Sequence, residues 1–347
     1  MTRFLQLHLL TVYPPANLNR DDTGRPKTAQ FGGHTRLRVS SQSLKRAWRT
    51  SEAFETALAG HLGKRTQRFA QKIEEHLLEG GADPAKAREI ARNVGDLFGK
   101  MKGEKDPNPT YLEQLAFIGP EEWATALDLA DKLAKGEKAD LDAHKVLRTA
   151  DSAVDIAMFG RMLADDPDFN REAAVQVAHA ITTHRVTVED DYYTAVDDLK
   201  RPSEDAGAGF IGEAGFGSGV FYLYACIDRD LLRRNLGGNV GLAGDGIAAL
   251  VEAAATVSPK GKQASYASRA RTSFILAEQG DTAPRTLAAA FLKPVQDDDV
   301  LADSIARLQG TRDQFARAYG DSPEHRVMNV LDEKSSTLAD IVAFARG

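Results

Sequence analysis

Cysteine is almost absent from this chain: its 347 residues include one, Cys226, in the apolar run VFYLYACI. A single cysteine allows no disulfide within the chain, which suits a protein of the reducing cytoplasm. The apolar neighbours predict a strand in the protein interior. We therefore expect a cytoplasmic protein in which this thiol is buried and reduced.

Long hydrophobic runs are also missing. The apolar stretch within MTRFLQLHLLTVYPP is too short to span a membrane, and no small-residue cleavage site follows it. We interpret it as a first buried strand from Phe4 to Tyr13 that ends at Pro14-Pro15. No membrane partner is expected.

The common motifs of enzyme chemistry are lacking as well. The sequence has no phosphate-binding loop of the Walker type, no HExxH pair and no paired CxxC. The glycines of GAGFIGEAGFGSG have no strand–turn–helix context, and His179 and His184 are interpreted as structural. The sequence therefore predicts no cofactor and no metal site.

Two adjacent carboxylates, Asp21 and Asp22, are the most enzyme-like feature. In a loop they could bind a divalent ion for phosphodiester cleavage, which makes a metal-dependent ribonuclease the alternative hypothesis. An Asx-turn or an ion pair with Arg20 is the more ordinary explanation.

Positive charge is concentrated in one place, although the chain is acidic overall. Residues 23–51 contain seven basic residues and no acid, so the rest of the chain, at −6 − 7, carries −13. The seven are Arg25, Lys27, Arg36, Arg38, Lys45, Arg46 and Arg49. Such a local field predicts a binding surface for a polyanion.

A short strand and a helix are predicted within this basic stretch. Alternation from Thr35 to Val39 predicts a strand with Arg36 and Arg38 on one face. Ser40-Ser41 then caps a helix in which Leu44, Ala47 and Trp48 form the apolar stripe. The opposite side carries Gln42, Lys45, Arg46 and Arg49. This pattern predicts phosphate binding near the helix N-terminus, with an ordinary solvated face as the alternative.

The remaining chain alternates between helical and strand-rich segments. Helical spacing dominates residues 58–163, and strands are predicted at AITTHRVTVE and SGVFYLYACI. Between those strands lies a long connection, Asp190 to Gly217, rich in glycine and acids. Further helices are predicted near Asp230 and over 245–257.

Several blocks in order resemble one known family. They include NRDD at 19–22, FGG at 31–33, VSSQSLKRA at 39–47, AHAITTH at 178–184, TAVDDL at 194–199, SGVFY at 218–222 and NLGG at 235–238. These blocks are similar to those of the CasC family, the RNA-binding backbone subunits of type I-E CRISPR Cascade. The resemblance covers roughly the first two-thirds of the chain.

The resemblance implies an α+β fold shaped like a hand. Its palm would be a modified RNA-recognition-motif (ferredoxin-like) domain at residues 1–57, 164–189 and 218–347. The helical insertion 58–163 would form the fingers, and 190–217 a β-hairpin thumb.

The implied function is structural and not enzymatic. Copies of the subunit would form a helical filament along the CRISPR guide RNA (crRNA), with the thumb of one copy kinking the RNA held by the next. The free bases would pair with target DNA in antiviral defence. Other Cascade subunits would cap the ribonucleoprotein, and a recruited helicase-nuclease would cut the DNA.

The implied RNA contacts are carried over residue by residue. In the palm they are Arg20, Lys27, His34, Ser40, Gln42, Lys45, Arg46 and Arg49, with Arg36 and Arg38 as added electrostatics, and in the thumb Tyr192, Tyr193 and Thr194. Tyr192-Tyr193 stands where the family has Trp-Phe, and His34 where it has a basic residue. The acids Glu189, Asp190, Asp191, Asp197, Asp198, Glu204 and Asp205 are predicted to meet the basic palm of the next copy.

A weaker basic track is predicted in the fingers for contact with target DNA. It comprises Lys132, Lys135, Lys138, Lys145 and Arg148. Interleaved acids such as Asp128 and Asp140 favour a solvated helix face instead.

Overall fold

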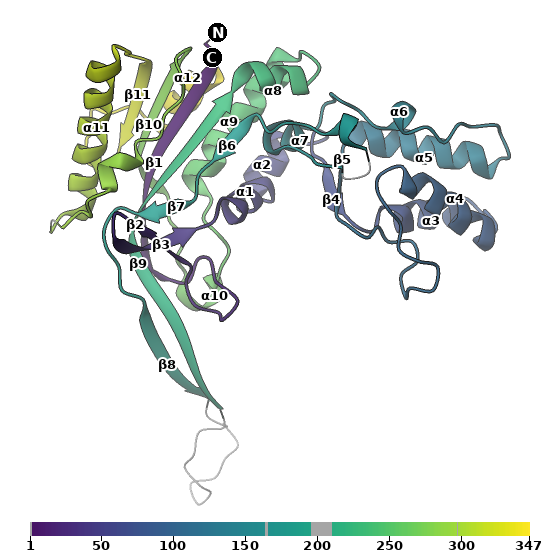
Figure 1. Ribbon diagram of the computed structural model, residues 1–347, viewed down its shortest axis with the longest axis horizontal. Helices are drawn as coiled ribbons and strands as arrows, with labels where there is room; N and C mark the ends of the chain where they lie inside the picture. The colour runs from purple at the N-terminus through teal and green to yellow at the C-terminus, as the bar shows by residue number, and fades with distance from the viewer. Residues whose placement is uncertain (1, 164–165, 196–209, 297) are drawn as a thin grey trace, which may run out of the picture. The chain divides into compact units, whose positions relative to one another are not determined.

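The computed structural model describes residues 2–163, 166–195, 210–296 and 298–347 (Figure 1). The chain forms two compact units. The first comprises Met1–Phe54, Val177–Cys226 and Leu250–Gly347, and the second comprises Glu55–Gln176 and Ile227–Ala249. The division into palm, fingers and thumb stays a prediction. Residues 55–57, 166–176 and 227–249, which it assigned to the palm, belong to the second unit.

A nine-stranded sheet organises the first unit, in the order β11-β10-β1-β9-β7-β3-β2, with β6 and β8 also paired to β9. The strands are β1 (Phe4–Ala16), β2 (Thr28–Phe31), β3 (His34–Val39), β6 (Val175–Val177), β7 (Ala180–Thr182), β8 (Glu189–Ala195), β9 (Phe210–Asp228), β10 (Thr272–Gly280) and β11 (Glu324–Asn329). Pairs such as β1–β10, β10–β11 and β3–β7 are antiparallel. This mixed fold with an antiparallel sheet agrees with the predicted α+β class.

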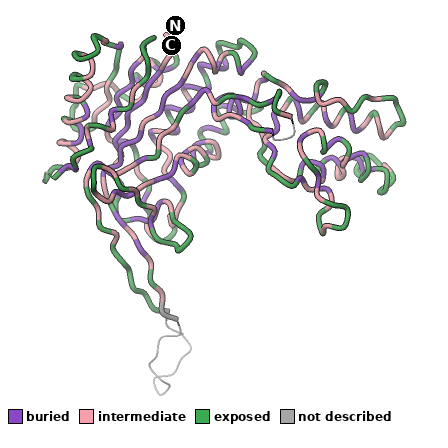
Figure 2. Tube along the Cα trace, viewed as in Figure 1, coloured by how far each residue is buried: buried purple, intermediate pink, exposed green. Residues whose placement is uncertain are grey.

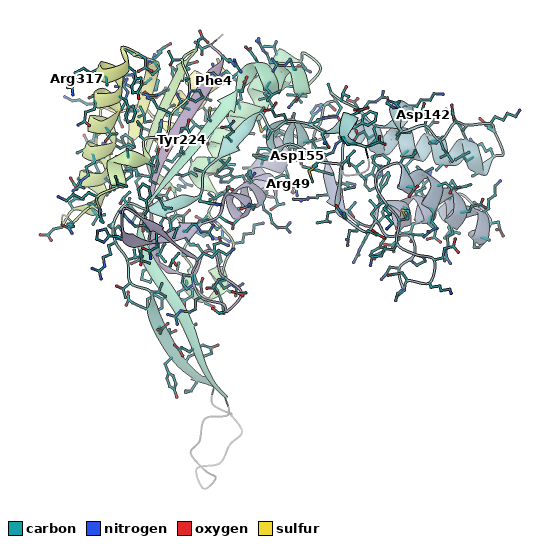
Figure 3. The ribbon with its side chains drawn as sticks, viewed as in Figure 1. Phe4, Arg49, Asp142, Asp155, Tyr224 and Arg317 are labelled. Carbon is teal, nitrogen blue, oxygen red and sulfur yellow. The ribbon has the colours of Figure 1, made fainter. Side chains whose placement is uncertain are left out.

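Helices of the first unit pack around this sheet. They are α1 (Ser41–Arg49), α10 (Gln263–Tyr266), α11 (Val300–Tyr319), α12 (Leu338–Arg346) and the 3-10 helix η2 (Ala288–Phe291). Ile305 and Leu308 of α11 pack with Phe274 and Leu276 of β10 in one buried cluster. Across neighbouring strands, the Tyr224 hydroxyl donates to Gln6 Oε1 at 2.9 Å. Tyr224 is labelled in Figure 3.

The second unit is mainly helical. Its elements are α3 (Phe69–Glu79), α4 (Pro84–Asp96), α5 (Pro120–Ala134), α6 (Ala143–Val146), α7 (Val154–Phe159), η1 (Pro167–Phe169), α8 (Arg229–Asn235) and the strand pair β4 (Lys64–Thr66) and β5 (Ala116–Ile118). Phe69 packs edge-on against Phe98 and Trp123, at ring-centroid distances of 4.6 and 4.7 Å. Helices α2 (Glu52–Ala57) and α9 (Val240–Thr256) contain residues of both units, as do strands β6 and β9. Buried segments follow the strands and the inner helix faces (Figure 2).

Two strand predictions are corrected by the structure. β1 continues through Pro14 and Pro15 to Ala16. Its register with β10 runs from Phe4 to Thr11, so the prolines, which have no N–H to donate, lie beyond that ladder. The segment AITTHRVTVE contributes β7 and the first residue of β8 rather than one strand. None of the described helices is long and apolar enough to span a membrane.

Arg36 lies in the interior, which corrects the prediction that its side chain belongs to the RNA-binding surface. Its exposed fraction is 0%. The guanidinium donates to the backbone oxygens of Thr182 at 3.0 Å and Phe291 at 2.8 Å. Because a buried charged group needs such partners, Arg36 links β3 to β7 and η2 and is unavailable to RNA.

We expect Arg36→Met to lower the free energy of unfolding by about 1–3 kcal/mol, since two buried carbonyls lose their donor. Arg38→Met is the matched control on the same strand, and as a partly exposed change it should cost about 0.5 kcal/mol or less. Urea denaturation of the full chain measures both. Equal stability of the two variants would contradict the interior role of Arg36.

Candidate nucleic-acid interface

Helix α1 presents the basic face that the sequence predicts. Ser40 is its N-cap, with its hydroxyl accepting from Ser43 N at 3.3 Å. Leu44, Ala47 and Trp48 are buried. Because these three anchor one side of the helix, Gln42, Lys45, Arg46 and Arg49 occupy the side away from the core.

The loop between β1 and β2 is fixed beside α1 by two asparagine side chains. Asn19 Oδ1 accepts from Ser40 N at 2.9 Å, which ties the loop to the start of the helix. Asn17 Nδ2 donates to the backbone oxygens of Gly24 and Gly215, both at 2.9 Å. The loop is therefore held to α1 at one point and to β9 at another.

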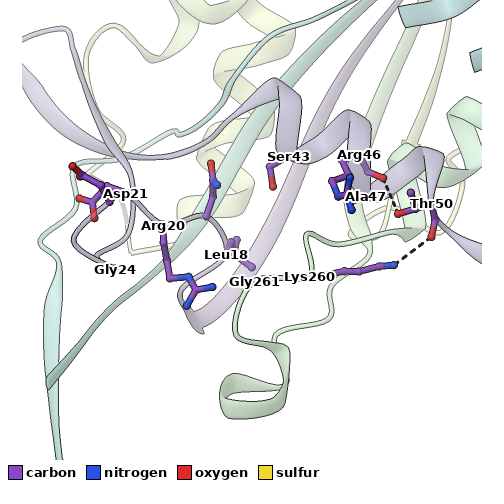
Figure 4. A pocket seen from close by; sticks show the side chains of 12 residues that line it. Leu18, Arg20, Asp21, Gly24, Ser43, Arg46, Ala47, Thr50, Lys260 and Gly261 are labelled. Carbon is purple, nitrogen blue, oxygen red and sulfur yellow. Dashed lines mark hydrogen bonds between the residues drawn. The ribbon is translucent and has the colours of Figure 1, made fainter. Parts of the chain in front are cut away.

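A groove lies between this loop, α1 and the segment before α10 (Figure 4). Its volume is about 540 Å³. The lining residues are Leu18, Asn19, Arg20, Asp21, Asp22, Gly24, Ser43, Arg46, Ala47, Thr50, Lys260 and Gly261. Lys260 Nζ donates to the backbone oxygen of Thr50 at 3.3 Å. Three cations, Arg20, Arg46 and Lys260, thus reach one concave surface from three parts of the chain.

The carboxylate of Asp21 organises its own turn. Oδ1 accepts from the Thr23 hydroxyl at 2.8 Å and from the backbone N–H groups of Thr23 and Arg25, both at 3.0 Å. The Thr23 hydroxyl bond is the main cause that lowers the pKa of Asp21. This is the Asx-turn that sequence reasoning considered. Among the residues the structure describes, no group of three or more His, Cys, Asp or Glu side chains could hold a metal ion.

Strands β8 and β9 form a hairpin that projects beyond the sheet (Figure 1). Tyr192 pairs with Glu213 and Tyr193 with Gly212, so the two rings lie on opposite faces. Tyr192 is 66% exposed and Tyr193 is 44% exposed. Neither ring belongs to the core.

Acids at the base of the hairpin meet a cation of the same chain. Arg25 lies 2.9 Å from Asp190 and 3.9 Å from Glu213, and all three side chains are substantially exposed. The predicted acids Asp197, Asp198, Glu204 and Asp205, together with Lys200 and Arg201, lie outside the described residues.

The comparisons with known proteins identify the family. The sequence matches CT1975-like proteins over residues 5–345. The chain belongs to the CT1975-like protein family. It is 30% identical to a chain of a "CRISPR RNA-guided surveillance complex, pre-nicking", with a TM-score of 0.88 over 99% of this chain and 100% of that one. For a chain of another "CRISPR RNA-guided surveillance complex" the identity is 25% and the TM-score 0.76, again over 99% and 100%.

These matches confirm the resemblance to CasC-type subunits that the sequence motifs indicated. No curated protein matches the chain at a significant level.

The predicted palm contacts of this CT1975-like protein separate into three groups. Arg20, Gln42 and Arg46 are exposed, and Lys27, His34, Arg38, Lys45 and Arg49 are partly exposed. Arg36 is buried and is removed from the set. Ser40 is also buried, and its hydroxyl caps α1, which leaves its predicted RNA contact without support.

Two of the five residues in the predicted DNA-binding track of the second unit are paired with acids. Lys132 lies 2.6 Å from Asp128, and Lys145 lies 2.9 Å from Asp140. The exposed Lys135 and Lys138 and the half-buried Arg148 complete the set. These pairs resemble the solvated helix face considered as the alternative, and DNA contact stays a prediction.

Sequence reasoning missed Lys260, Gly261 and Ser43 as part of the groove. The available signal was the basic, glycine-containing run SPKGKQ at 258–263. A Cβ on Gly261 would lie 2.3 Å from the backbone oxygen of Leu18 and 2.7 Å from that of Asn17. Only glycine allows this segment to approach the loop so closely.

We expect Gly261→Ala to move the Lys260 segment away from the groove, because both obstructing atoms belong to the backbone. The free energy of unfolding should fall by about 1–3 kcal/mol, and the affinity for single-stranded RNA should fall with it. Thermal unfolding and fluorescence anisotropy measure the two effects.

Gly310→Ala is the control for this change. It lies in helix α11, and nothing is within 4 Å of its added Cβ. The same methyl group should raise stability there by about 0.5–1 kcal/mol and leave RNA binding unchanged. Wild-type RNA affinity in Gly261→Ala would show that this close approach is irrelevant to the groove.

Proposed function

We propose that this protein is a non-catalytic backbone subunit of a type I-E Cascade complex that holds the sugar-phosphate backbone of CRISPR guide RNA. The observation that carries this proposal is the groove beside α1, where Arg20, Arg46 and Lys260 converge next to a helix face without acids. Cations placed in a groove neutralise phosphates irrespective of base sequence. A guide holder needs that property because its spacer sequence varies.

The hairpin has the features of a wedge for nucleic acid. Two exposed tyrosines on opposite faces project from a β-ribbon, and either ring can stack on a base. In the proposed assembly, copies of the chain form a helical filament along the RNA, and each hairpin kinks the RNA held by the next copy. Spaced kinks would leave the intervening bases free to pair with target DNA.

The partners follow from this role. They are guide RNA, further copies of the chain, other Cascade subunits and target DNA, with a recruited helicase-nuclease acting on the complex in the cytoplasm. Support comes from the two matched chains, which belong to assemblies named as CRISPR RNA-guided surveillance complexes. We further propose that the sheet of the first unit is the modified RNA-recognition-motif palm.

The ribonuclease alternative receives less support. Three hydrogen bonds from its own turn engage Oδ1 of Asp21, so this carboxylate has a clear structural role. No specific observation assigns a chemical role to Asp22, which is exposed beside it.

Replacing Lys45 and Arg49 by alanine tests the proposal. If each side chain neutralises one phosphate, the double variant should reduce the slope of log K against log salt by about 1.4 per subunit, from ~0.7 for each phosphate on a single strand. The loss should be equal for all spacer sequences, since phosphate contacts carry no sequence information. Filter binding at several salt concentrations measures the slope.

Lys105→Ala with Lys334→Ala is the matched control. Both lysines are exposed and lie outside α1 and the groove, so the same loss of two charges should leave the slope unchanged. A wild-type slope in the Lys45/Arg49 variant, or a loss limited to some spacers, would refute the backbone-binding role. Evenly spaced cuts in labelled target RNA incubated with Mg²⁺ would favour the ribonuclease instead.

Alanine at both Tyr192 and Tyr193 should relax the kink in the bound RNA. Each lost base stack is expected to cost about 1–3 kcal/mol. Fluorescence of 2-aminopurine placed along the guide in the assembled complex reports the unstacked positions, and the two single variants identify which ring stacks. Tyr319→Ala, on a ring 76% exposed at the end of α11, is the control. An unchanged fluorescence pattern in the double variant would exclude the hairpin as the wedge.

A further inference from the structure

His179 makes an unusual contact with the start of α1. Its ring lies directly before β7, and Nδ1 accepts a hydrogen bond from the backbone N–H of Ser41 at 2.9 Å. A ring nitrogen that accepts a hydrogen bond carries no proton, so the neutral imidazole has its proton on Nε2. The backbone of α1 therefore selects one tautomer of this side chain.

Cations from three other segments lie near enough to act on the ring electrostatically. Lys45 comes from α1, Arg38 from β3 and Lys27 from the segment before β2. The backbone keeps these segments together: Arg38 N donates to Lys27 O at 2.8 Å, and Val39 pairs with Ala180 of β7. Partial burial, followed by the charges of Arg38, Lys27 and Lys45, lowers the pKa of His179. The ring is thus a neutral donor within a positive cluster.

Because His179 is exposed, its Nε2 is accessible to a ligand. The residue is exposed, and within the described part of the chain Nε2–H has no hydrogen-bond acceptor. A phosphate oxygen suits this place because it accepts from Nε2–H and is attracted by the three cations at the same time. This cluster flanks α1 on the Lys45 side, whereas the groove flanks it on the Arg46 side.

We propose that His179 is a further RNA-binding residue, whose Nε2–H donates to a backbone phosphate held by Lys27, Arg38 and Lys45. The inference rests on the proposed function and adds a second phosphate position on the other flank of α1. It also changes the interpretation of His179 from a structural residue to one with two roles, one for each ring nitrogen.

Two substitutions separate these roles. Asparagine places an amide oxygen at about the position of Nδ1, so His179→Asn keeps the acceptor for Ser41 N–H and lacks a group at the position of Nε2. Glutamine reaches the position of Nε2, so His179→Gln keeps the donor and lacks the acceptor. The two variants therefore test the roles of the two ring nitrogens separately.

The full chain is titrated with a mixed-sequence single-stranded RNA, and its thermal unfolding is recorded. We expect His179→Asn to unfold as the wild type does and to weaken RNA binding about ten- to hundredfold, the effect of one hydrogen bond to a charged group. His179→Gln should retain affinity within about twofold and unfold at a lower temperature. In ¹⁵N-histidine spectra, RNA should shift the Nε2 resonance of the wild-type ring.

Wild-type affinity in His179→Asn, with an unmoved Nε2 resonance, would overturn the inference. If the Lys45/Arg49 double variant loses affinity in the same assay while His179→Asn does not, the proposed contact by His179 is wrong and the proposed function stands. If the wild-type chain does not bind the RNA at all, both the inference and the proposed function fall.

Discussion

The candidate interface depends on how two asparagine amides hold the loop between β1 and β2. Asn17 is almost completely buried, and its amide bridges Gly24 of the loop and Gly215 of β9. Asn19 accepts from the backbone of Ser40, so the loop and the helix cap share one hydrogen bond. These bonds hold the loop that carries Arg20 beside α1, so the cations of the loop and of the helix line one groove.

This arrangement also explains how an acidic protein maintains a basic surface. Like charges on α1 repel one another, and the buried stripe of Leu44, Ala47 and Trp48 holds them in place. Asp21, which lines the groove, accepts hydrogen bonds within its own turn from the Thr23 hydroxyl and two backbone N–H groups. Asp190 is engaged by Arg25. Local hydrogen bonds therefore engage the carboxylate of Asp21 in the groove, and an ion pair engages that of Asp190 in the hairpin.

Basic residues lie on both sides of α1. The groove with Arg20 and Lys260 lies on one flank, and His179 with Lys27 and Arg38 lies on the other. In the proposed assembly, RNA that follows α1 would meet cations on both sides of the helix. Such a path would contact the sugar-phosphate backbone of the RNA and leave the base edges free, as a guide-RNA holder requires.

The sequence by itself determined the local features of this protein. It predicted the cap at Ser40, the three buried residues of α1 and the exposed basic face, because helix capping and helical periodicity depend on neighbouring residues alone. Its motifs also indicated the family. Only the tertiary structure decided that Arg36 is buried while Arg38 is not, since strand alternation cannot show which backbone carbonyls will meet a side chain. The tertiary structure alone also brought Lys260 to the groove and His179 to α1, because both contacts join residues more than 100 positions apart, and no local pattern encodes such a distance.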